Sequence, residues 1–124
     1  MKKFVSIMNH MLTAEQLAQA KNFKGESLEV IEVKGPIVDP TASKEEVYMV
    51  AKEYLNQLPE ETHYVNIMSD FGFTIAVVSL LQSGIYGDII PVYATTHRVV
   101  NEVTNPDGSV TKTAVFKHVQ FREY

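Results

Sequence analysis

The chain of 124 residues contains no cysteine and no tryptophan. Without cysteine it can form no disulfide, zinc–thiolate site or iron–sulfur cluster, and no thiol can act as a nucleophile. This absence also fits a reducing compartment. The net charge of −4 disfavours a protein that coats nucleic acid, because long-range attraction to phosphates requires a basic surface. Any phosphate ligand must therefore be held by local donors.

Long apolar runs are missing as well. The longest apolar stretch, residues 73–81, is interrupted by Thr74 and Ser79 and is far shorter than the ~20 residues that span a bilayer. The apolar stretch near the amino terminus ends at Asn9, whereas a signal peptide needs a longer one followed by a cleavage site. We therefore expect a cytoplasmic protein without a membrane partner.

The remaining composition is that of an ordinary globular protein, with 45% hydrophobic and 21% charged residues. No internal repeat and no linker interrupts the sequence, and its length is typical of one domain. We expect a single Rossmann-like domain over residues 1–124, with residues 98–124 as a β-hairpin extension.

Segments with strand and helix patterns alternate along most of the chain. Helices are predicted to begin at Thr13, Ser43 and Phe71, where Thr13 with Gln16 and Ser43 with Glu46 have the spacing of capping boxes. The first should end near Gly25, the second at Pro59 and the third at Gln82, before a glycine. The predicted strands are residues 3–8, 27–33, 63–68 and 89–94.

The last quarter of the chain is rich in β-branched residues. Residues 99–104 and 109–121 flank the turn sequence Asn105-Pro106-Asp107-Gly108, which predicts a β-hairpin. The alternating strands and helices before it imply right-handed crossovers and a mostly parallel sheet. The fold predicted is therefore α/β: a compact, Rossmann-like sandwich with three helices and a carboxyl-terminal hairpin.

Polar residues follow three of the predicted parallel strands, at residues 9–13, 69–72 and 95–98. Ligands of open parallel sheets bind beyond the carboxyl ends of the strands. Each group alone can be a cap or turn, and Thr13 and Asp70 can cap helices without any ligand. Three groups at one edge favour a binding site.

The chemistry at this edge suits a phosphate. Two helix amino termini, at Thr13 and near Phe71, would present free amides there. Gly72 lets a ligand approach the backbone closely, and Arg98 offers a bidentate guanidinium. On position alone, Arg98 can equally be an exposed residue at the start of a strand.

Of the four histidines, His10 and His97 flank this edge, whereas His63 begins the third strand at its opposite end and His118 belongs to the hairpin. None has the spacing of metal ligands on a helix, so no metal site is predicted. His10 can act as a general acid or base, or it can make a loop hydrogen bond. No glycine-rich phosphate-binding motif is present, which argues against ordinary NAD or NTP binding and leaves no cofactor predicted.

The sequence at these positions resembles the small CRISPR-associated ring nucleases of type III systems, relatives of the CRISPR-associated Rossmann fold (CARF). The resemblance is carried by Asn-His-Met-Leu-Thr-Ala-Glu-Gln at 9–16, Asp-Phe-Gly-Phe-Thr at 70–74 and Tyr-Ala-Thr-Thr-His-Arg at 93–98. It extends from about residue 3 to residue 98. The chain departs from the pattern at Met68-Ser69, where the resemblance leads us to expect a small turn that contains glycine.

The resemblance implies a homodimer that binds a cyclic oligoadenylate, with cyclic tetra-adenylate as the first candidate, on its two-fold axis. It implies a metal-independent reaction in which a ribose 2′-OH attacks the neighbouring phosphate. The linear product carries a 2′,3′-cyclic phosphate, and its formation switches off antiviral signalling.

The resemblance also implies roles for single residues. The implied catalytic residues are Asn9, which orients a ribose or phosphate, His10, which carries a proton, and Arg98, which holds the phosphate together with amides near Gly72. The implied ligand-binding residues are Ser69, Asp70, Phe71, Gly72, Thr74, Thr95, Thr96 and His97.

Two other functions remain open at this stage. The same site could sequester or sense a cyclic nucleotide without cutting it. Alternatively, the hairpin and the third helix could form an interaction module. Long nucleic acid is not an expected partner, because the chain is acidic.

Overall fold

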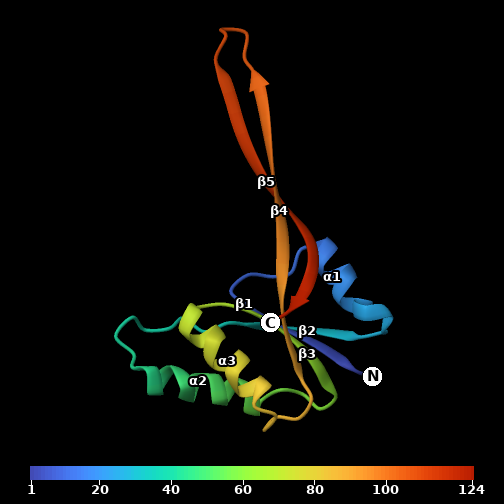
Figure 1. Ribbon diagram of the computed structural model, residues 1–124, viewed down its shortest axis with the longest axis vertical. Helices are drawn as coiled ribbons and strands as arrows, with labels where there is room; N and C mark the ends of the chain where they lie inside the picture. The colour runs from blue at the N-terminus through green and yellow to red at the C-terminus, as the bar shows by residue number, and fades with distance from the viewer.

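A five-stranded β-sheet forms the centre of the molecule, and the computed structural model describes all residues from 1 to 124 (Figure 1). The strands are β1 (Lys3–Met8), β2 (Glu29–Lys34), β3 (Thr62–Met68), β4 (Ile90–Thr104) and β5 (Val110–Glu123). The helices are α1 (Ala14–Lys21), α2 (Lys44–Asn56) and α3 (Phe71–Gln82), and a short 3-10 turn at Phe23–Gly25 follows α1. None of the three helices has the length and apolarity required to cross a bilayer.

The strands lie in the order β2-β1-β3-β4-β5. β1 is parallel to β2 and to β3, β3 is parallel to β4, and β5 returns antiparallel to β4. The chain moves from β1 to β2 on one side and then crosses back to β3 on the other, so the strand order reverses between β1 and β3. The predicted α/β, Rossmann-like fold with a mostly parallel sheet, three helices and a carboxyl-terminal hairpin is confirmed.

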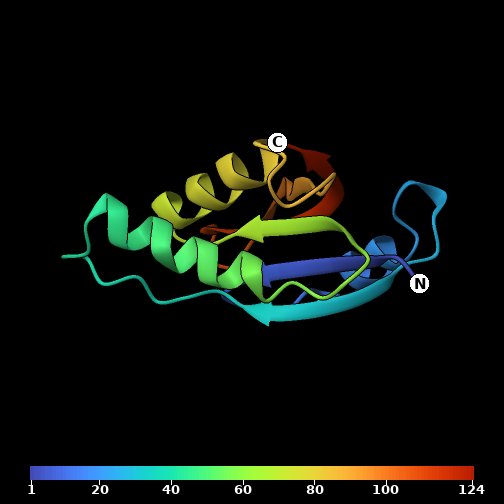
Figure 2. The same ribbon diagram turned by 90° about the horizontal axis from the view of Figure 1, so that it is seen from below.

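Helices cover both faces of the sheet, with α2 and α3 side by side on one face and α1 on the other (Figure 2). Alternate residues of β1 explain how both faces are filled: Val5 and Ile7 pack under α2 and α3, whereas Phe4 packs against Ala20 of α1. Phe73 of α3 is completely buried. Each such side chain contributes about 1.5–3 kcal/mol by leaving water.

The predicted helix starts are correct. The hydroxyl of Thr13 accepts from Gln16 N (3.2 Å) and the Gln16 amide oxygen accepts from Thr13 N (3.0 Å), which completes a capping box. Ser43 Oγ accepts from Glu46 N (3.1 Å), but no side-chain bond returns from Glu46, so only half of the second predicted box forms. At the start of α3, Asp70 Oδ2 accepts from Phe73 N (3.1 Å).

The prediction for β4 is wrong in its end. We expected this strand to stop at Ala94 and a separate hairpin to begin at Val99, but β4 continues without a break to Thr104. Residues 95–98 include no glycine or proline that could end a strand, and they pair with β5 throughout. The extension predicted at 98–124 also differs, because the end of β5 returns to the sheet and buries Phe121 in the core.

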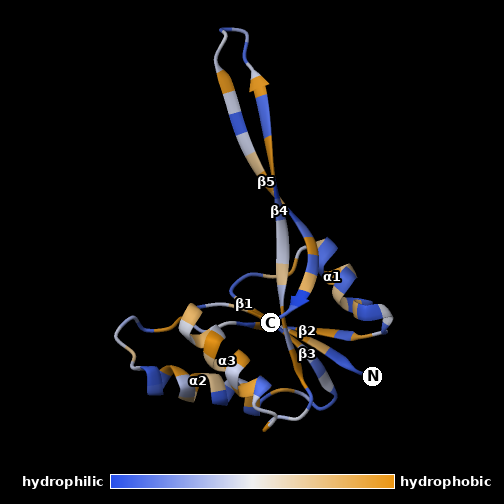
Figure 3. Ribbon diagram, viewed as in Figure 1, coloured by the Kyte–Doolittle hydropathy of each residue, from blue (hydrophilic) through white to orange (hydrophobic).

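The hairpin divides the molecule into a body and an arm. We call residues 96–118 the arm: the outer part of β4, the turn, and the outer part of β5. The arm projects far beyond the helices, and a bulge between Thr95 and Thr96 marks its base (Figure 1). Figure 3 shows hydrophobic segments along its whole length. Its large exposed apolar residues are Val100, Val103, Val110, Val115 and Phe116.

Candidate functional site

The largest cavity at the carboxyl edge of the sheet lies where the strand order reverses. It measures about 760 Å³ and is bounded by the segments that follow β1 and β3, by residues 36–38 after β2, and by two tyrosines from β4 and the chain end. This is the position at which ligands of open α/β sheets bind. Six predicted site residues line this cavity: Asn9, His10, Ser69, Asp70, Phe71 and Thr74.

Asn9 and Ser69 join the ends of β1 and β3. Ser69 Oγ donates to Asn9 Oδ1 at 2.6 Å, and Asn9 Nδ2 lies 3.4 Å from the carbonyl oxygen of Pro36. Gly35, at the end of β2, is buried against this pair. A Cβ atom on Gly35 would lie 2.7 Å from both Asn9 Oδ1 and Ser69 Oγ, so only glycine fits without displacing them. The three strand ends are therefore held in close contact.

The first turn of α3 forms one wall of the cavity. Asp70 caps the helix, and Ser69 N donates to Thr74 Oγ1 at 3.1 Å, so this loop is fixed by its own hydrogen bonds. The Phe71 ring is 89% exposed, which leaves an aromatic face available to a ligand. Gly72 is exposed and does not line the cavity itself.

Two tyrosines that the sequence analysis missed form the opposite wall. The rings of Tyr93 and Tyr124 lie 4.7 Å apart, and the hydroxyl of Tyr124 donates to the carbonyl oxygen of Ile67. Burial raises the pKa of Tyr124 to about 12, so this donor stays protonated at neutral pH. Arg122 donates from Nη1 to the Tyr93 hydroxyl (3.1 Å) and is the cation that accompanies this wall.

The signal for these residues was present in the sequence but could not be interpreted without the register of β4 and β5. Tyr93 is opposite Arg122 in the ladder. Alternation places the side chain of Tyr93 on the opposite face from those of Val92 and Ala94, which pack in the core under α1.

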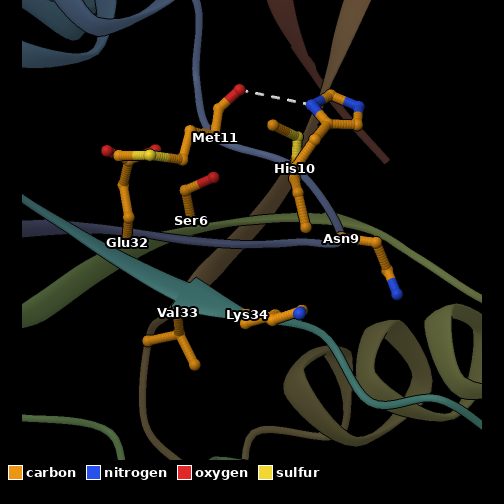
Figure 4. Close-up of a pocket in the computed structure, with 8 residues that line it drawn as sticks. Ser6, Asn9, His10, Met11, Glu32, Val33 and Lys34 are labelled. Carbon is orange, nitrogen blue, oxygen red and sulfur yellow. Dashed lines mark hydrogen bonds between the residues drawn. The ribbon is translucent and has the colours of Figure 1, made fainter.

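A smaller cavity of about 350 Å³ opens on the other side of Asn9 and His10 (Figure 4). Ser6 and Glu32 point to one side of the ribbon in this view, and Val33 points to the other. The Ser6 hydroxyl accepts from Asn66 Nδ2 (3.0 Å) inside the sheet. Glu32 accepts from Leu12 N (2.7 Å), and Lys34 contributes a cation to the lining.

His10 borders both cavities. Its side chain is exposed, and Nδ1 lies 3.2 Å from the carbonyl oxygen of Met11, the contact drawn in Figure 4. Donation from Nδ1 to this oxygen would leave Nε2 of the neutral imidazole free to accept a proton. Nowhere in the chain do three side chains of His, Asp or Glu gather into a metal site.

The third predicted group does not join the other two in this chain. Thr95, Thr96, His97 and Arg98 line neither cavity, because β4 carries them outward into the hairpin. Thr95 Oγ1 donates to the carbonyl oxygen of Gln120 (3.2 Å). Arg98 is exposed and lies five residues beyond Tyr93, about 16 Å along an extended strand. The cations that accompany the two cavities are instead Lys34 and Arg122.

Comparison with known proteins identifies relatives along the whole chain. Residues 2–122 match the model of the family described as "Uncharacterized protein MJ1673 family". The protein MJ1673 of Methanocaldococcus jannaschii is 30% identical over 130 residues, a match that covers 100% of this chain and 98% of that protein. No solved structure matches the chain significantly.

Proposed function

The chain belongs to the MJ1673 family, and we propose that it is a ring nuclease that binds and cleaves a cyclic oligoadenylate, with cyclic tetra-adenylate as the first candidate. The observation that carries the proposal is the cavity where the strand order reverses. All three segments on which the resemblance rests contribute to its lining: residues 9–16 and 70–74 with two or more residues each, and residues 93–98 through Tyr93 alone. The cleavage would end signalling by the cyclic messenger in a type III CRISPR response.

The walls of the cavity suit the parts of an oligoadenylate. Adenine bases stack on aromatic side chains, and Phe71, Tyr93 and Tyr124 offer such faces. Ribose hydroxyls can both donate and accept, which matches the Asn9–Ser69 pair. The amino terminus of α3 provides a favourable potential for a phosphate near Phe71.

The proposed reaction needs positioning, removal of the proton from the 2′ oxygen, and delivery of a proton to the 5′ oxygen that leaves, which departs as a hydroxyl. Asn9 would orient the ribose so that its 2′ oxygen lies in line with the bond that breaks. That oxygen attacks the adjacent phosphorus, the 5′ oxygen of the next nucleotide leaves, and a 2′,3′-cyclic phosphate remains. His10 is the candidate that accepts the 2′ proton, because its imidazole borders the cavity.

The charge on the phosphate requires a cation. Within one chain, Lys34 lines the smaller cavity, and Arg122 donates to the hydroxyl of Tyr93, which lines the larger one. Arg98 would take part only if a second copy of the chain brings its hairpin to the cavity, so its proposed role requires the homodimer. Arg98→Ala should then weaken ligand binding by about 1.5–3 kcal/mol per site. An unchanged dissociation constant would remove Arg98 from the site.

The direct test is incubation of the pure protein with an excess of radiolabelled cyclic tetra-adenylate in EDTA. We expect linear products that end in a 2′,3′-cyclic phosphate, resolved by chromatography. His10→Ala should lower the cleavage rate about 100-fold or more while binding persists. His63→Ala is the matched control, because its Nδ1 also lies 3.2 Å from a backbone oxygen but at the opposite edge of the sheet.

The outcomes separate the proposal from its alternative. Ligand that is retained on the protein but never cut would support a sponge or sensor. One observation favours that alternative. Cleavage needs a group that accepts the 2′ proton, whereas binding does not. The Asp70 carboxylate is engaged in capping α3, so His10 is the one free proton acceptor among the predicted residues of the cavity. Absence of both binding and cleavage would overturn the nuclease and the sponge together.

A further inference from the structure

The arm has an open edge along β4. Within the sheet, β3 pairs with β4 only as far as Asn66 opposite Val92, and Ala94 N then donates to Met68 Sδ at 3.3 Å. From Thr96 to Thr104, β4 pairs with β5 on one side and with no strand on the other. A two-stranded ribbon by itself is only marginally stable in water, and an open edge is a template for another strand.

The backbone groups on this edge can be assigned. The N–H of Ala94 points away from β5, because it donates to Met68 of β3. Along a strand, alternate residues direct their N–H and C=O groups to the same side. The register shift at the base of the arm places the additional residue, Val119, in β5, so the alternation in β4 continues unbroken. The residues whose N–H groups face the open edge are therefore Thr96, Arg98, Val100, Glu102 and Thr104.

The charges on these residues favour the same strand of a second copy. In an antiparallel pair centred on Val100, Arg98 lies opposite the partner's Glu102, and the reverse contact is made by symmetry. Opposite charges at directly paired positions stabilise a sheet, and like charges destabilise it. Parallel pairing in register would oppose Arg98 with its own copy.

Other registers are disfavoured. A register in which even-numbered residues oppose odd-numbered ones would set outward N–H groups against inward ones. Moving the centre from Val100 to a neighbouring residue keeps the backbone in phase but separates Arg98 from the partner's Glu102. The β5 edge cannot make such a contact, because residues 110–118 carry Lys112 and Lys117 and no acidic residue.

We propose that two copies of the chain pair edge to edge through β4 of the arm, antiparallel about Val100, into a four-stranded intermolecular sheet. Within each hairpin, Lys112 of β5 lies opposite Glu102 of β4 and contacts it at 3.4 Å. In the dimer the partner's Arg98 lies on the other side of Glu102, so Lys112, Glu102 and the partner's Arg98 form a row of alternating charge across the sheet. Thr96 lies opposite the partner's Thr104, a pair that also favours strand association.

The pairing has a consequence for the candidate site. It covers nine residues, about 30 Å of strand, and ends with the partner's Thr104 opposite Thr96. The turn that follows the partner's Thr104 would then lie beside Ala94 and Met68, and Met68 lines the larger cavity. The two-fold axis passes between the two Val100 residues rather than through the ligand. The partner's Arg98 lies opposite Glu102 in this pairing, so a contact between Arg98 and the ligand would require a different association of the two copies. The inference rests on the arm alone and not on the proposed nuclease activity.

Sedimentation velocity over a range of protein concentrations tests the pairing without any ligand. We expect the unchanged protein to form a dimer. Arg98→Glu and Glu102→Arg should each raise the dissociation constant about tenfold or more, because each change sets like charges opposite one another at both symmetric contacts. The double variant R98E/E102R should restore it. Lys117→Glu, the same change of charge on β5, is the matched control and should leave the dimer in place.

A second variant addresses the backbone. Val100→Pro removes an N–H that faces the open edge and spares the bonds between β4 and β5, so the arm should fold and the dimer should be lost. Val100→Ala keeps this N–H and should dimerise. A protein that remains monomeric at all concentrations would overturn the inference, as would a dimer that neither Arg98→Glu nor Val100→Pro weakens. Because no ligand is used, neither outcome bears on cleavage of cyclic oligoadenylates.

Discussion

In the body, β-branched and aromatic residues lie between helical layers, whereas in the arm the same residue types lie on an open ribbon. Val92 of β4 is completely buried, but Val103, further along the same strand, is 57% exposed. The body is therefore stabilised mainly by removal of apolar surface from water. The arm is stabilised by the hydrogen bonds between β4 and β5 and by any strand that pairs with its open edge. A single strand thus passes from one stabilising mechanism to the other at the bulge between Thr95 and Thr96.

The largest contrast should be seen when one phenylalanine is truncated in each region. Phe73 is completely buried in the body, and its ring lies 5.1 Å from that of Tyr54. Phe73→Ala should lower the free energy of unfolding by about 3–5 kcal/mol, through lost transfer energy and the cavity left behind. Phe116 of the arm is 66% exposed, so Phe116→Ala should change it by no more than about 0.5 kcal/mol in the monomer.

Urea unfolding of both variants, followed by far-UV circular dichroism, measures the two values. Equal losses would show that the arm has a core of its own and that the division into body and arm is mistaken.

A smaller contrast is expected between two glycines that are required for different reasons. Gly35→Ala would set a methyl group 2.7 Å from Asn9 Oδ1 and Ser69 Oγ and should cost about 1–3 kcal/mol of stability. Gly108, at the tip of the arm, has open space around it but a φ of +86°. Gly108→Ala should cost about 1–2 kcal/mol from backbone strain alone.

Ligand binding distinguishes these two variants more clearly than stability does. Only Gly35→Ala should disturb the Asn9–Ser69 pair and weaken binding of cyclic tetra-adenylate. If Gly108→Ala weakens it equally, the tip of the arm takes part in the site.

Most of the body could be predicted from local sequence signals. Caps at Thr13 and Asp70, the apolar pattern of α3 and the alternation of strands and helices each report on contacts within a few residues. The end of β4 could not be predicted in the same way. β-branched residues from Ile90 to Thr104 are compatible with one long strand or two short ones, and the pairing with β5 decides between them.

The candidate site was predictable to the same extent. Segments that follow β1 and β3 converge because parallel neighbours end at the same edge, and this needs no long-range information. Arg98 was misplaced because its position depends on where β4 ends. Tyr124 and Arg122 were missed because their place in the site depends on antiparallel register, which sequence alone does not determine.

The junction of body and arm should respond to pH. His118 Nε2 and Gln19 Oε1 of α1 lie 2.7 Å apart, and His118 Nδ1 is buried without a partner. Burial lowers the pKa of His118 below its usual 6.5, against an opposing effect of Glu15. The unfolded chain therefore binds the proton more readily, so stability is complete above about pH 6.5 and is lost as the pH falls through the folded-state pKa.

His118→Gln removes this titration and keeps a polar side chain. Urea unfolding at pH 7 and pH 5 should show a smaller loss of stability on acidification in the variant than in the unchanged protein. A loss of the same size in both proteins would mean that His118 is solvated at the base of the arm.

The smallest effect is expected for an ion pair within the arm. Lys112 and Glu102 are 3.4 Å apart and both are well exposed, so Lys112→Ala should change the free energy of unfolding by no more than about 0.5 kcal/mol. Glu102→Ala should be equally mild for the monomer. The two variants should differ only in association, because Glu102 faces the open edge and Lys112 does not. Sedimentation velocity should therefore detect weaker dimers for Glu102→Ala alone, and equal dissociation constants would imply that the charge on Glu102 acts only within its own hairpin.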